Sequence, residues 1–125
     1  MARYEHLPIY RTTYDLFIDV LQVTKTFSRD YRYTLGAHLH ESAIKLLKQV
    51  YLINSARDKV DALKQMLLYI QEIGVLLRAS KDLKIMAENR FFALLEKRDS
   101  LEKQTTGWLK SFEKNRAGII PPECG

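Results

Sequence analysis

Hydrophobic residues recur at intervals of three and four along most of the chain, which is the spacing of one face of an α-helix. Four segments show this pattern, and short polar connections separate them. We expect helices at about 8–27, 31–54, 57–83 and 87–114. Long helices joined by short connections pack as antiparallel neighbours. The pattern therefore predicts an all-α protein, an antiparallel up-down-up-down four-helix bundle.

The chain has room for a single domain, because it is only 125 residues long. We expect the bundle to occupy residues 1–115 and a flexible tail to follow at 116–125. The end of the chain lacks helical periodicity and carries Pro121 and Pro122, which do not continue a helix.

The first two expected helices each carry two adjacent apolar rows instead of one. In the first helix, one row is Tyr10, Tyr14, Phe17 and Leu21, and the other is Leu16, Val20, Val23 and Phe27. A wide apolar arc within one bundle explains a second row, and so does a subunit interface. Both interpretations are open from the pattern alone.

Three glycines interrupt the helical patterns, at Gly36, Gly74 and Gly107. A glycine within a helix costs about 1 kcal/mol relative to alanine, so each position requires a reason. A close approach of another element or a local break in the helix would supply one.

The composition excludes several classes of protein. Hydrophobic residues make up 46% of the chain, too many for a disordered protein, and 5 Gly with 3 Pro are too few for a β-sandwich rich in turns. The single Cys124 cannot form an internal disulfide, and no apolar segment is long enough to form a signal core or cross a membrane. The expected location is the cytoplasm.

Signatures of catalysis and metal binding are mostly absent from the sequence. No glutamate is followed by a histidine three positions later, as a di-iron bundle requires, and there is no glycine-rich phosphate loop. His38 and His40 lie about 200° apart on a helix and do not share one metal. We therefore expect no catalytic residue, no metal site and no cofactor.

One pair of residues offers an enzymatic alternative. Arg32 and His38 have the Arg-x5-His spacing found in the HEPN ribonucleases, which are also helical bundles. In such a site the histidine transfers a proton and the arginine stabilises charge on the phosphate. This motif usually lies late in that bundle, whereas here it lies in the second expected helix.

Basic residues cluster near the expected helix ends and are the candidates for binding a nucleic acid or a protein partner. They are Arg29, Arg32, Arg57, Lys59, Arg78, Lys81 and Lys84. The first and third connections of an up-down bundle lie at one end, where five of these residues would form a positive rim. The net charge of +5 permits a polyanionic partner, although ordinary solvated charges also explain the pattern.

Several short motifs, in order and spread over 7–115, resemble those of the Avd proteins. The matching segments are residues 7–10, 28–36, 54–59, 77–83 and 107–111. The Avd proteins are the accessory variability determinants of bacterial and phage diversity-generating retroelements.

The resemblance implies a four-helix bundle that assembles into a homopentameric ring and has no catalytic activity of its own. It also implies binding to a reverse transcriptase and to template-repeat RNA, with DNA as a further candidate ligand, in support of mutagenic cDNA synthesis. No membrane takes part. The alternative is an interaction protein of the type encoded within intervening sequences of ribosomal RNA, which has a similar fold and no polymerase partner.

Overall fold

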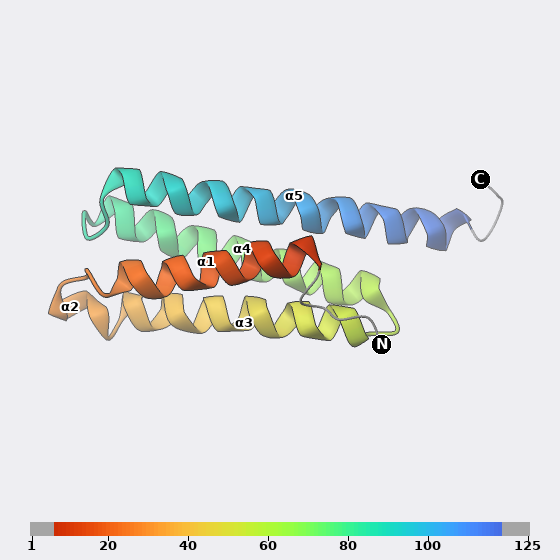
Figure 1. Cartoon of the computed structure of the whole chain (residues 1–125), viewed down its shortest axis with the longest axis horizontal. Coiled ribbons are helices and arrows are strands. Elements are labelled where there is room, and N and C mark those ends of the chain that lie inside the picture. The colour runs from red at the N-terminus through yellow and green to blue at the C-terminus, as the bar shows by residue number, and fades with distance from the viewer. Residues whose placement is uncertain (1–6, 119–125) are drawn as a thin grey trace.

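The structure, a computed structural model, describes residues 7–118, with side chains as far as Lys114. This part of the chain forms helices and their connections and contains no strand. In chain order the helices are α1 (Pro8–Thr24), α2 (Arg29–Arg32), α3 (Leu35–Ser55), α4 (Lys59–Asp82) and α5 (Glu88–Gly118) (Figure 1). The predicted all-α class is confirmed, and α2 is a short helix in addition to the four long ones.

The first connection differs from the expected one. The chain leaves the helical conformation after α1, buries Phe27, forms α2, and then starts α3 at Leu35. Thr34, with φ −111° and ψ −89°, lies outside the helical region and separates the two helices. The second long helix therefore begins later than the pattern indicated, because burial of Phe27 turns the chain before it.

The other connections are short and closed by hydrogen bonds. Asp58 caps α4 by accepting from the backbone N–H of Val60 at 3.1 Å. Ser55 belongs to the last turn of α3. At the other end of the chain, α5 continues past Lys114 to Gly118, so the helix extends into the expected tail; residues 119–125 lie outside the described part.

The core is built from one apolar row of each long helix. In α1 the row Leu16, Val20, Val23 is buried and continues to Phe27, whereas Tyr14 of the other row is exposed. The other helices bury rows at the same spacing: Leu39, Ala43, Leu46, Val50 and Ile53 in α3, Leu63, Ile70 and Leu77 in α4, and Phe91, Leu94, Leu101 and Leu109 in α5. The row that includes Leu16 is therefore part of the core and not a subunit interface, and the row that begins with Tyr10 lies mostly outside the core.

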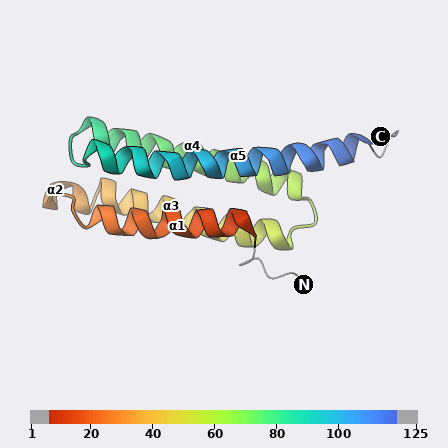
Figure 2. The same cartoon turned by 45° about the horizontal axis from the view of Figure 1, so that its top comes forward.

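Each long helix packs against two others, α1 against α3 and α5, and α4 against α3 and α5 (Figures 1 and 2). Polar pairs join neighbouring helices along the outside of the core. In α1 and α5, Gln104 donates to the Thr12 hydroxyl at 2.8 Å, and Lys97 donates to the Asp19 carboxylate. The residue numbers along α1 rise while those of the partners on α5 fall.

Candidate nucleic-acid interface

One end of the bundle carries two of the three connections. Figures 1 and 2 both show α2 and the connection between α4 and α5 at the same end, with the connection between α3 and α4 at the other. Arg29 and Arg32 lie on α2, Lys81 lies at the end of α4, and Lys84 lies in the following connection. We call this the α2 end of the bundle. Arg78 lies one turn earlier on α4, so the structure brings these five predicted residues to one region.

The helix α2 is fixed to the bundle at both sides. Phe27 is fully buried before it, and Tyr31 packs against the core within it. After it, Gly36 is buried in α3, and an added Cβ there would stand in van der Waals contact with the Tyr31 carbonyl oxygen, at 3.4 Å. Helix α2 therefore packs against Gly36, and α3 is not broken at this glycine. The exposed side chains of α2 therefore project from an ordered support.

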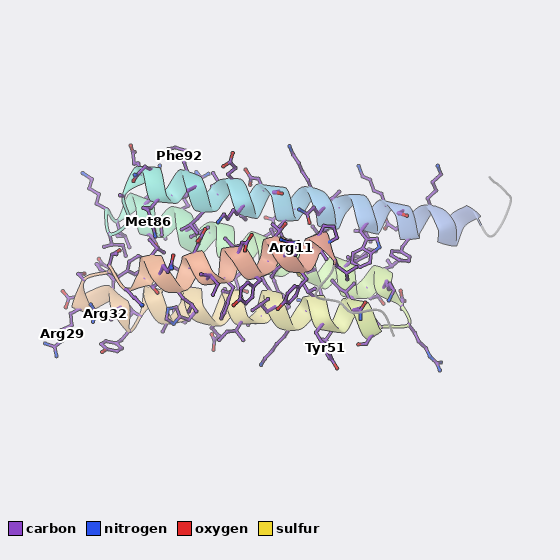
Figure 3. The ribbon with its side chains drawn as sticks, in the orientation of Figure 1. Arg11, Arg29, Arg32, Tyr51, Met86 and Phe92 are labelled. Atoms are coloured by element: carbon purple, nitrogen blue, oxygen red, sulfur yellow. The ribbon has the colours of Figure 1, made fainter. Side chains whose placement is uncertain are left out.

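The two arginines of α2 differ in their surroundings. Figure 3 shows Arg29 extending away from the end of the bundle. Arg32 is also exposed, but its Nη2 lies 3.4 Å from the Phe27 carbonyl oxygen, to which it donates a long hydrogen bond. Arg29 is thus the cation of α2 with the greater reach, while Arg32 also closes the turn.

The connection after α4 holds Lys84 in an unusual backbone conformation. Its φ is +61°, the left-handed region that glycine most often occupies at the end of a helix. The Lys84 N–H donates to Lys81 O at 2.9 Å and the Ile85 N–H donates to Ser80 O at 3.1 Å. These two bonds close α4, and the Lys84 side chain remains exposed.

Lys81 is already engaged within the fold. Its ammonium lies 5.2 Å from the centre of the Phe91 ring and 3.7 Å from the Asp82 carboxylate. A cation over an aromatic face is attracted to the ring, so Lys81 helps to join α4 and α5. It contributes charge to the α2 end but is not a freely extending side chain.

Arg57 and Lys59 lie at the other end of the bundle, in or beside the connection between α3 and α4. The Lys59 ammonium donates to the carbonyl oxygens of Ile53 at 2.9 Å, Asn54 at 3.2 Å and Ala56 at 3.1 Å. These carbonyls lie at the C-terminus of α3, where a positive charge is favoured. Lys59 therefore closes a helix, whereas Arg57 is exposed.

The sequence interpretation missed two cations at the α2 end. Lys25 follows α1 and Arg90 lies in the first turn of α5, and both are exposed. Their positions in the sequence, beside the first and third connections, would have identified them. Carboxylates are also present at this end, on Asp30, Asp82 and Glu88.

Arg32 and His38 lie on different helices, α2 and α3, and both are exposed. Within residues 7–118 there is no cluster of three or more His, Cys, Asp or Glu residues that would hold a metal ion. Among the helices of the same range, none is both long and apolar enough to cross a membrane.

Two outer faces of the bundle carry exposed apolar side chains. The α1–α3 face has stacked Tyr10 and Tyr14, with ring centres 6.0 Å apart, and a groove where Tyr10 meets Tyr51 and Leu52. The α4–α5 face has Leu68 and Val75 on α4, 62% and 68% exposed, and Phe92 on α5. Figure 3 shows Tyr51 and Phe92 at opposite edges of the bundle.

Arg98 of α5 explains the glycine at position 74 of α4, where the two helices pack together. Its Nε donates to the Ile70 carbonyl oxygen at 3.2 Å, and an added Cβ at Gly74 would stand 2.6 Å from that Nε. Gly74 therefore makes room for a side chain of the neighbouring helix. Gly107, in contrast, has open space around it, and nothing in the structure explains it.

Comparison with known proteins relates most of the chain to one family. A family model described as bAvd-like matches residues 8–112, which cover α1 to α4, most of α5 and both connections of the α2 end. No curated protein matches the chain.

Proposed function

The chain belongs to the bAvd-like family, and on that premise we propose that it is an accessory protein of a diversity-generating retroelement. In this proposal it binds the reverse transcriptase and the template-repeat RNA, and it supports mutagenic cDNA synthesis. The family is one of accessory proteins and not of known enzymes. The protein acts by holding its partners together.

The observation that carries the RNA-binding part is the gathering of cations at the α2 end. Arg29, Lys84 and Arg90 are exposed there, and the segments that carry Arg29 and Lys84 are fixed by hydrogen bonds and by burial of neighbouring residues. Exposed cations on a fixed support attract phosphates without reading bases. Arg57, at the other end, is a weaker candidate because its neighbour Lys59 is used to close α3.

The proposal includes an antiparallel up-down-up-down order of the four long helices. The polar pairs support it, because partner numbers run in opposite directions in neighbouring helices. In α3 and α4, Ser42 donates to Glu72 at 2.6 Å, and Gln49 donates to the Ala62 carbonyl oxygen at 2.8 Å. From Ser42 to Gln49 the residue number on α3 rises, whereas that of the partner on α4 falls from Glu72 to Ala62.

The proposal also includes a homopentameric ring in which the α1–α3 face of one copy packs against the α4–α5 face of the next. Two different apolar faces on opposite edges of one bundle support a head-to-tail contact, and such contacts form a ring when the rotation between successive copies closes. A ring would repeat the α2 end around one axis. The summed positive surface would then exceed what one chain offers.

Co-purification tests the proposed function. The tagged full-length protein is expressed with the retroelement's reverse transcriptase and template-repeat RNA, and an unrelated structured RNA serves as the control. We expect recovery of the polymerase and enrichment of the template-repeat RNA over the control. Recovery of neither partner with an intact oligomer would contradict the proposal and favour a bundle protein without a polymerase partner.

A further inference from the structure

The residue that ends α2 has a side chain that the fold does not use. Tyr33 is 74% exposed, the highest value among the large apolar side chains of the described residues. Its neighbour Tyr31, two positions earlier, packs against the core. The two tyrosines flank Arg32, so the chain buries one aromatic ring and presents the other to solvent.

The backbone around Tyr33 is held in place on both sides. The Arg32 N–H donates to Ser28 O at 2.9 Å, and the Thr34 N–H donates to Tyr31 O at 3.3 Å. The Thr34 hydroxyl also donates to Asp30 O at 3.2 Å, and Thr34 O accepts from the His38 N–H at 3.0 Å in the first turn of α3. The exposed ring therefore stands on an ordered turn, which lowers the entropy lost when a ligand stacks on it.

We propose that α2 and Tyr33 form a binding site for an unpaired RNA strand, with the Tyr33 ring stacking on a base and Arg29 contacting the adjacent phosphates. This inference rests on the proposed RNA-binding function and adds that the bound segment of the RNA is unpaired. Aromatic rings among cations are the features that bind single strands, since every base offers a flat face. In a duplex the bases are stacked inside and the ring has no base face to reach.

The position of Arg32 supports this assignment. Its guanidinium donates a long hydrogen bond to the Phe27 carbonyl oxygen, so its positive charge is held at the start of the turn that carries Tyr33. Arg29, one helical turn earlier, extends outward (Figure 3). The exposed ring of Tyr33 and the extended side chain of Arg29 thus come from the same short segment of the chain. Asp30 is the only carboxylate within α2 and opposes phosphate binding there.

Two RNA probes separate stacking from charge. The full-length protein is titrated into a fluorescein-labelled oligouridylate of about 20 nucleotides and into a duplex RNA of the same length, with anisotropy as the readout. We expect Tyr33→Ala to weaken binding of the single strand about tenfold and to leave duplex binding within about twofold. Tyr33→Phe keeps a ring and should bind both probes as the natural protein does.

Charge variants provide the matched control. Arg29→Ala should weaken binding of both probes and reduce the slope of log affinity against log salt by about 0.7–0.9 for each phosphate that Arg29 neutralises. Lys103→Ala, which removes an exposed cation from α5, should change neither. Circular dichroism and the oligomeric state verify that each variant is folded.

Unchanged affinity of Tyr33→Ala for the single strand would overturn the inference, as would an equal loss for both probes. Retained RNA affinity with loss of the reverse transcriptase would assign Tyr33 to a protein contact instead. If the natural protein binds neither probe and recovers no RNA with the polymerase, the proposed function fails and the inference fails with it. If only Tyr33→Ala is without effect, the inference alone fails.

Discussion

The two ends of the bundle use their cations differently. At the α2 end, Arg29 and Lys84 are exposed on backbone that hydrogen bonds already hold in place. At the other end, the Lys59 ammonium is surrounded by three carbonyl oxygens of the end of α3. Both regions looked alike in the sequence, as basic residues beside a connection.

The difference follows from which groups close each helix. Helix α3 ends with carbonyls beside the start of α4, so a lysine in the first turn of α4 reaches them. Helix α4 ends with backbone bonds from Lys84 and Ile85, so its carbonyls are paired without a side chain. Where backbone N–H groups pair the last carbonyls of a helix, the nearby lysine is available to an external partner. Where a lysine side chain pairs them, it is not.

The largest effect is expected from separating the copies of the proposed ring, because this removes the repetition of the α2 end. Val75→Asp places a charge on the α4–α5 face, and Tyr51→Asp does the same on the α1–α3 face. Each variant should elute as a monomer, and its affinity for a long RNA should fall about 100-fold because multivalent binding is no longer available. Light scattering gives the mass, and anisotropy gives the affinity.

A mixture of these two variants tests the head-to-tail contact itself. Each variant retains the face that is altered in the other, so an equal mixture should form a dimer and stop there. A ring in either single variant, or a mixture that remains monomeric, would contradict the pairing of these two faces.

Matched charge removals compare the two ends directly. Arg29→Ala with Lys84→Ala should lower RNA affinity about tenfold and reduce the salt slope, because fewer phosphates are neutralised. Arg57→Ala with Lys110→Ala removes the same charge near the other end and should lower affinity by no more than about threefold. Equal losses in the two double variants would show that only net charge matters.

Replacing Lys59 should affect stability more than RNA binding. Lys59→Met keeps the aliphatic chain and removes the ammonium that donates to the last carbonyls of α3. We expect the free energy of unfolding to fall by about 1–2 kcal/mol. Urea denaturation measures this change. An unchanged stability with a large loss of RNA binding would move Lys59 into the interface.

The smallest effect is expected at Lys84, where charge and backbone act in opposite directions. Lys84→Gly relieves the positive φ and should stabilise the protein by about 0.5–1 kcal/mol. The same change removes an exposed cation, so RNA affinity should fall modestly as it does in Lys84→Ala. Lys84→Ala should be less stable than Lys84→Gly, and the reverse order would contradict the role of this conformation.

The sequence predicted the helices well because each buries a row at helical spacing. The pattern did not show which of the two rows of α1 faces the core: Leu16, Val20 and Val23 lie in it, and the row beginning with Tyr10 and Tyr14 lies toward the outside. The separate α2 was not predicted, since Phe27 continues the apolar spacing of α1 in sequence while its backbone has already left the helix. Periodicity does not register such a turn.

The candidate site was predicted only as a set of cations. Connections and charge pointed to Arg29 and Lys84, and the structure brings them to one end of the bundle. The engagement of Lys59 and Lys81 could not be predicted, because it depends on which carbonyls and rings lie within reach in three dimensions. Tyr33 was part of a recognised motif, but its exposure depends on the break between α2 and α3.

Photo-crosslinking of the purified complex of this protein, the reverse transcriptase and the template-repeat RNA tests the central claim most directly. Mass spectrometry then identifies the peptides that carry crosslinked nucleotides. We predict crosslinks to α2 with Tyr33 and to the segment 81–90. Crosslinks confined to the segment 55–64, with none at the α2 end, would contradict the account.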